Sequence, residues 1–176
     1  MHGLLQLAVQ GSSMAQLFLG DMYFRGEGCS QDYKKAAYWY LRSATGGNAD
    51  AQLSIGLMYS TGAGVEKSPI ESCRYLKMAA MQGNPIAQYN LAKLYLEGTL
   101  PQGREYNEAF HWMHSSALLG NDCARYSLGI MYANGIGTER SLDESLKWLR
   151  LASQQGNDDA IDVLCLLCMR SGNNVT

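Results

Sequence analysis

The sequence contains no apolar run that approaches the ~20 residues needed for a membrane-spanning helix, so it predicts no membrane span. It also lacks an excess of basic charge: 14 Lys and Arg stand against 16 Asp and Glu, giving a formal net charge of −2. Nucleic-acid binding proteins normally present a basic face, so this balance argues against a nucleic-acid partner. No basic stretch followed by a long apolar stretch is visible near Met1. The cytoplasm is therefore the default compartment, and the periplasm or secretion would follow if a signal peptide had been removed.

Residue patterns typical of catalysis are missing as well. No serine stands in a glycine-flanked nucleophile motif, and the acidic residues do not cluster in one segment. His111 and His114 are three residues apart and could share a helix face, but no third metal ligand accompanies them. The loop Gly26-Glu27-Gly28 lacks the preceding strand and the third glycine of a dinucleotide-binding motif. We expect no catalytic residues, no metal and no cofactor, and we expect that the chain is not an enzyme.

The five cysteines form no pairing pattern. Their odd number and irregular spacing favour free thiols and a reducing compartment, although proteins with free cysteines can also be exported. Cys165-x-x-Cys168 has the spacing of half a redox or metal site, but no second Cys-x-x-Cys completes a zinc site. Both residues stand at positions that hold glycine or tyrosine in the repeats described next, which favours a buried role as small hydrophobic side chains.

What the sequence does contain is the motif Gly-Asn-x-x-Ala-Gln-x-x-Leu-Gly-x-Met-Tyr, which returns along nearly the whole chain. Its leading glycines lie 36, 36, 37 and 36 residues apart, at Gly11, Gly47, Gly83, Gly120 and Gly156. A fixed period of this size is typical of a solenoid of stacked units. We predict one solenoid domain over residues 1–176. Its parts are a partial helix (1–10), four repeats (11–46, 47–82, 83–119, 120–155) and a terminal helix (156–176).

Each repeat is expected to contain two helices joined by a glycine-rich loop. The first helix carries an apolar stripe, as in Ala15, Leu19 and Tyr23 of the first repeat. A small residue follows the stripe's leucine or isoleucine in each repeat, which indicates close approach of a neighbouring helix; these residues are Gly20, Gly56, Ala92 and Gly129. The second helix carries a ladder of large aromatics that we interpret as core: Trp39, Tyr75, Trp112 and Trp148.

These motifs resemble the Sel-one-like repeat (SLR) family, a relative of the tetratricopeptide repeat. The resemblance rests on Ala-x-x-x-Leu-Gly-x-Met-Tyr, then Gly-x-Gly, then an aromatic helix that leads to Gly-Asn, and it covers residues 11–155. It implies an all-α fold, an α/α superhelical solenoid of helix-loop-helix repeats. It also implies a non-enzymatic adaptor that binds a protein or peptide in its concave groove, in bacteria often in envelope or host-interaction processes.

A second interpretation comes from the cysteine-rich branch of this family, some of whose members bind or weakly hydrolyse β-lactams. In that branch a disulfide ties the two helices of each repeat. The first-helix positions where its cysteines are expected hold Gln16, Gln52, Gln88 and Arg125 in this sequence. The second-helix positions hold Ala44, Ala80, Ala117 and Ser153, so the disulfide framework is absent.

In a tetratricopeptide-like arrangement, the first helices line the concave side. Two positions on these helices lie outside the core stripe and are largely apolar or aromatic, which is unusual for a water-facing surface. We predict that they bind the partner, with Tyr89 and Tyr126 as anchors; the residues are Leu17, Asp21, Leu53, Leu57, Tyr89, Lys93, Tyr126 and Ile130. The alternative is that superhelical curvature buries these side chains against adjacent repeats.

The last helix is apolar on nearly every side, whereas the terminal helix of a solenoid should present a polar outer face. Leu164, Leu167 and Met169 have no following helix in this sequence to cover them. This pattern predicts a homodimer through the C-terminal helix, or a longer array of repeats.

Overall fold

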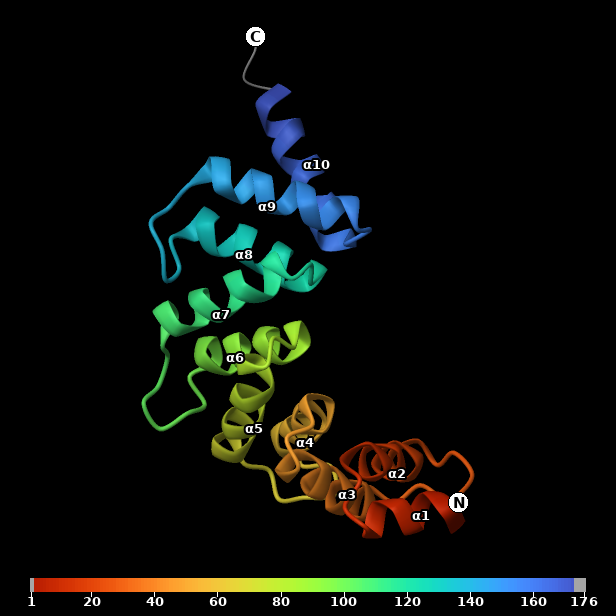
Figure 1. The fold of residues 1–176 in the computed structure, drawn as a ribbon. Helices are drawn as coiled ribbons and strands as arrows, with labels where there is room; N and C mark the ends of the chain where they lie inside the picture. Colours follow the sequence, from red (N-terminus) through yellow and green to blue (C-terminus); the bar gives the residue numbers. More distant parts are fainter. Residues whose placement is uncertain (1, 173–176) are drawn as a thin grey trace. The chain divides into compact units, whose positions relative to one another are not determined.

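A computed structural model describes the backbone of residues 2–172 and the side chains of residues 3–166. Within that range the chain forms ten α-helices and no strand (Figure 1). The helices are α1 (His2–Val9), α2 (Ser13–Arg25), α3 (Tyr33–Thr45), α4 (Ala49–Thr61), α5 (Pro69–Met81), α6 (Pro85–Glu97), α7 (Tyr106–Leu118), α8 (Asp122–Asn134), α9 (Leu142–Gln154) and α10 (Asp158–Gly172). The prediction of an all-α solenoid of helix-loop-helix repeats is confirmed.

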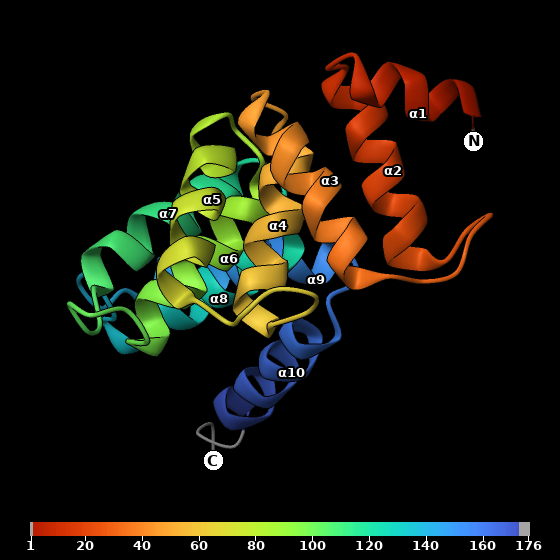
Figure 2. The same cartoon turned by 90° about the horizontal axis from the view of Figure 1, so that it is seen from below.

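The chain divides into two compact units, Met1–Ala87 and Gln88–Thr176. In the first unit, α2 packs against both α1 and α3, α3 packs against α4, and α4 packs against α5. Figure 2 shows α1 to α4 following one another in this unit. In the second unit α8 packs between α7 and α9, and α10 packs against α9. Each of these helices therefore contacts its neighbour in the chain, as expected for stacked repeats.

The helix boundaries follow from side-chain and glycine caps. Asn48 and Asn121 begin α4 and α8, and each side-chain oxygen accepts a hydrogen bond from the backbone N–H three residues later. Gly62 and Gly135 end the same helices in the left-handed conformation, with φ of 82° and 69°. The glycine-rich loop of each of these repeats therefore begins with the residue that ends the first helix.

The small residue on the first helix is required by close packing. A Cβ atom built on Gly56 would lie 2.9 Å from Cγ of Leu76, and one built on Gly129 would lie 2.8 Å from Cγ of Leu149. In both repeats the first and second helix meet at this point. A larger side chain would force the two helices apart.

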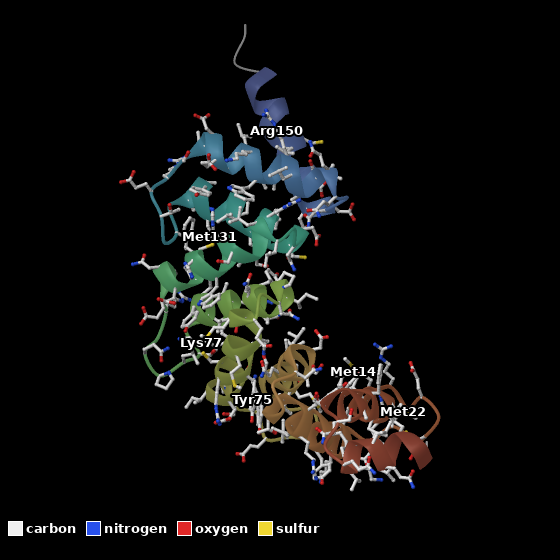
Figure 3. The ribbon with its side chains drawn as sticks, in the orientation of Figure 1. Met14, Met22, Tyr75, Lys77, Met131 and Arg150 are labelled. Carbon is white, nitrogen blue, oxygen red and sulfur yellow. The ribbon has the colours of Figure 1, made fainter. Side chains whose placement is uncertain are left out.

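The aromatic ladder on the second helices is largely core, as predicted. Trp39, Tyr75 and Trp148 are 8%, 9% and 5% exposed, while Trp112 is half-buried. Most of the apolar stripe of the first helices is buried too, including Met131 of α8 (Figure 3), whereas Tyr23 is half-buried.

The second glycine of the loop has a role beyond turning the chain. A Cβ atom on Gly64 would overlap the backbone carbonyl of Tyr33, and one on Gly137 would overlap the carbonyl of Tyr106. Tyr33 and Tyr106 begin the second helix of the preceding repeat. The absence of a side chain therefore lets each loop lie against the preceding repeat.

Polar side chains also join successive repeats. The buried Gln52 donates from Nε2 to the carbonyl oxygen of Ala44 at 3.2 Å, and its Oε1 accepts from Gln82 Nε2 at 2.8 Å. Arg125 takes the same place in the second unit, donating to the Ala117 carbonyl at 3.1 Å and to Gln155 Oε1 at 2.7 Å. At two positions where the cysteine-rich branch would carry a thiol, this chain instead carries hydrogen-bond donors.

Candidate functional site

A hollow of about 290 Å³ lies between the first helices of two successive repeats, α2 and α4. The buried Tyr40 of α3 also lines it, and Ala63 contributes from the loop after α4. Two of the predicted binding residues, Asp21 and Leu57, line this hollow from opposite helices. The first unit therefore contains a hollow whose lining includes two of the residues predicted to bind a partner.

A polar network lies inside this hollow. The Tyr40 hydroxyl donates to Oδ1 of Asp21 at 2.7 Å, and the Ser54 side chain hydrogen bonds to the same phenol. Burial, followed by the bond to Asp21, raises the pKa of Tyr40 far above its ordinary value of 10.0. The phenol is therefore a proton donor under ordinary conditions, and it fixes the position of the Asp21 carboxylate.

The rim of the hollow is aromatic and charged. The Phe24 ring lies edge-on to Tyr33 at 5.3 Å and tilted to Tyr40 at 6.4 Å, measured between ring centroids. The Arg25 side chain is mostly exposed, and its guanidinium Nη1 lies 3.7 Å from Oε1 of Glu27. Sequence reasoning missed the contributions of Phe24, Arg25 and Tyr40. Phe24 and Arg25 lie one helical turn after Asp21, on the same helix face, and this spacing could have indicated them.

Leu17 needs a correction. Its side chain is only 8% exposed and packs in a core cluster with Ala36, Tyr40 and Ile55. The reason is the burial against an adjacent repeat that was considered as the alternative, because Ala51 and Ile55 of the next repeat belong to the same cluster. Leu17 therefore offers no surface to a partner, while Leu53, one repeat later, is half-buried.

In the second unit, Tyr89 and Lys93 lie together on α6. The Lys93 ammonium is 5.8 Å from the centroid of the Tyr89 ring, and the Ser127 side chain of α8 hydrogen bonds to the Tyr89 phenol. Burial, followed by the nearby Cys123 thiol, raises the pKa of Tyr89. Tyr89 is half-buried and Lys93 is exposed, so both retain surface that a partner could contact.

Tyr126 and Ile130 have a different environment. Both are partly buried against a core cluster formed by Leu149, Ala152 and Ala160, where α9 and α10 meet. They therefore stabilise the packing of the second unit, and their predicted role in binding applies only to the part of each side chain that stays exposed.

The C-terminal helix presents part of the predicted apolar surface. Leu164 is partly buried against the cluster around Leu149, whereas Leu166 is 58% exposed. The predicted interface residues Leu167 and Met169, and also Cys168, lie outside the residues whose side chains are described. No disulfide joins the four cysteines that are described, which are Cys29, Cys73, Cys123 and Cys165.

His114 and His111 do not gather further metal ligands. Within the described part of the chain, no group of three His, Cys, Asp or Glu residues could hold a metal ion. The His114 ring instead packs between two aromatic rings. Its centroid lies 5.9 Å from that of Phe110 and 5.7 Å from that of Trp148. Over the same described residues, no helix is both long and apolar enough to span a bilayer.

Comparison with solved structures finds helical repeat proteins of the same kind. A Sel1 repeat protein from Oxalobacter formigenes is 35% identical, with a TM-score of 0.81 over 93% of this chain. A protective antigen of uropathogenic Escherichia coli that displays an SLR fold is also 35% identical, with a TM-score of 0.85 over 89%. A Pseudomonas aeruginosa protein, 24% identical with a TM-score of 0.55 over 89% of this chain and 58% of its own length, shares the fold. The chain spans 47% of the length of the first structure and 33% of the second. No curated relative matches it.

The Sel1 repeat profile matches the chain four times, at residues 13–48, 49–84, 85–121 and 124–157. These ranges start within about four residues of the predicted repeats because the profile begins at the first helix and not at the leading glycine. The matches cover most of the chain and agree with the 35% identity to known members. This chain therefore belongs to the Sel1 repeat family.

Proposed function

We propose that this chain is a protein-interaction scaffold that binds a protein or peptide segment along the face of its first helices. The observation that carries the proposal is the hollow between α2 and α4. It combines an apolar wall with a fixed carboxylate, and a few placed polar groups in an apolar concavity are typical of binding sites.

Family membership supports this function. Sel1 repeat proteins generally act as scaffolds for protein interactions and are typically not enzymes. The surfaces proposed for binding are Asp21, Leu53 and Leu57 in the first unit, and the exposed parts of Tyr89, Lys93, Tyr126 and Ile130 in the second. No observation favours the β-lactam interpretation, and we do not propose it.

Affinity capture with matched variants tests the proposal. The half-buried Leu57 lines the hollow, whereas Ile70 is a 58% exposed apolar residue on α5. We expect Leu57→Arg to lose a protein that the wild type captures from the native organism, and Ile70→Arg to retain it. Equal capture by the wild type and both variants would contradict the assignment of the hollow, and absence of any captured protein would contradict the scaffold function.

A further inference from the structure

The hollow between α2 and α4 has a feature that no other repeat shares. At the position of Asp21 the other repeats carry Leu57, Lys93 and Ile130, and at the position of Tyr40 they carry Leu76, Met113 and Leu149. Only the first repeat combines a carboxylate with a phenol, and these two groups are hydrogen bonded at 2.7 Å. The leucines at the equivalent position fill the core without a polar atom, so packing alone does not require the Tyr40 hydroxyl.

The Tyr40 ring packs directly against the small residue of α2. A Cβ atom on Gly20 would lie 2.5 Å from ring carbons of Tyr40, so the glycine makes room for the ring. Tyr40 is 3% exposed and supports the carboxylate from inside the core, while the half-buried Ser54 side chain hydrogen bonds to the Tyr40 phenol. A carboxylate whose supporting groups are buried and hydrogen bonded keeps one orientation, which favours recognition of a charged partner group.

The Asp21 carboxylate has no cationic partner of its own. Among the described residues, no lysine or arginine lies within ion-pair distance of it. Arg25 lines the same hollow but is 65% exposed, and its guanidinium is directed to Glu27 at 3.7 Å. The fixed charge inside the hollow is therefore negative.

The walls around this carboxylate are mainly apolar. Phe24 contributes from α2, Leu57 and Met58 from α4, and Ala63 from the following loop. At about 290 Å³, the hollow is at or below the small end of small-molecule pockets, which run from roughly 300 to 1,000 Å³. Its size therefore suits a single long side chain.

We propose that this hollow binds a lysine or arginine side chain of the partner segment. The methylene groups of such a side chain contact the apolar walls, and its charged end donates hydrogen bonds to Asp21. An acidic side chain has no fixed cation to meet there, because Arg25 is exposed and already adjacent to Glu27. The inference rests on the proposed peptide-binding function and adds the chemical class of the residue recognised.

Selection of random linear peptides displayed on phage tests this inference. We expect peptides enriched by the wild-type chain to share a lysine or arginine, and Asp21→Asn to lose this preference. The asparagine oxygen can still accept the Tyr40 hydrogen bond, so the variant removes the charge and keeps the packing. Glu66→Gln makes the same change of charge at an exposed loop residue outside the hollow, and we expect it to select the same peptides as the wild type.

A double-mutant cycle on the affinity for one synthetic peptide from the selection makes the test more specific. We expect Asp21→Asn to weaken its binding about tenfold or more, as for loss of a charged hydrogen bond. Replacing the basic residue of the peptide by glutamine should cause a similar loss, and the two changes together little more than either alone. Selected peptides without a shared basic residue, or additive losses in the cycle, would overturn the inference and leave the scaffold function standing. Failure to select any peptide would instead contradict the proposed function itself, and the inference with it.

Discussion

Gly56 shows how one small residue sets the distance between the two helices of a repeat. The position directly faces Leu76, and a Cβ atom added to the glycine would lie 2.9 Å from the leucine Cγ. We expect Gly56→Leu to destabilise the protein by about 2 kcal/mol or more through overpacking. Urea unfolding measures the loss, and Glu66→Leu in an exposed loop is the control, with little expected change. Equal losses for both variants would show that the assigned helix contact is wrong.

The partly buried His114 should make the stability of the protein depend on pH. Burial first, and then the neighbouring His111, lower the pKa of His114 from its ordinary 6.5; Glu144 opposes this effect and Lys147 adds to it. The folded state therefore binds the proton less readily than the unfolded state does. The contribution of His114 to the free energy of unfolding is therefore fully present above about pH 6.5. It falls as the pH drops from there toward the folded-state pKa.

The measurement is the melting temperature between pH 8 and pH 5.5. We expect the wild type to lose stability at the acid end, and His114→Phe, which keeps a ring between Phe110 and Trp148, to lose less. The equivalent positions on α5 and α9 hold the exposed Lys77 and Arg150 (Figure 3), so only this repeat buries part of a titrating ring here. Parallel curves for the two proteins would refute the assignment.

At the scale of the element, the loop between the helices of a repeat locks that repeat to the preceding one. Gly137 has φ of 67°, and a Cβ atom there would meet the carbonyl of Tyr106. Gly83 also has a positive φ, 85°, but a Cβ atom there meets nothing within 4 Å. We expect Gly83→Ala to cost about 1 kcal/mol for backbone strain and Gly137→Ala clearly more, because it adds a clash to a similar strain.

Denaturant unfolding of the two alanine variants isolates the contact between repeats, since the backbone cost is common to both. The contact predicts a difference between the two losses in the free energy of unfolding. If the two losses are the same, the loop does not determine how the repeats pack.

The sequence also predicts that the chain forms a homodimer through its C-terminal helix. Leu166 is 58% exposed on α10, next to Cys165, which is also exposed. If α10 forms a homodimer interface, Leu166→Glu should convert a dimer to a monomer, because a carboxylate is poorly tolerated in an apolar contact. Sedimentation equilibrium measures this, with circular dichroism to check that helicity is unchanged. A wild type that stays monomeric at high concentration would disprove the dimer.

Across the whole chain, the repeat period predicts the all-α fold, the glycine-rich loops and the aromatic core, because each depends on spacing along the chain. The rotation of a helix about its axis does not follow from spacing to the same accuracy. Leu17 lies on the first helix of the first repeat, and Leu57 lies on the first helix of the second repeat, one turn further along. Leu17 is buried in the core, whereas Leu57 lines a hollow. The pairing of Asp21 with Tyr40, nineteen residues apart, depends on that rotation and was therefore not predictable.

We propose above that partners bind along the face formed by the first helices. Methyl NMR spectra of the chain, recorded with and without a captured partner or selected peptide, test it most directly. We expect the methyl signals of Leu53, Leu57 and Met58 to shift on binding. Those of Ile70 and Leu142, which are 58% and 57% exposed on second helices, should not shift. Shifts confined to Ile70, Leu142 and their neighbours, with Leu57 and Met58 unchanged, would contradict it.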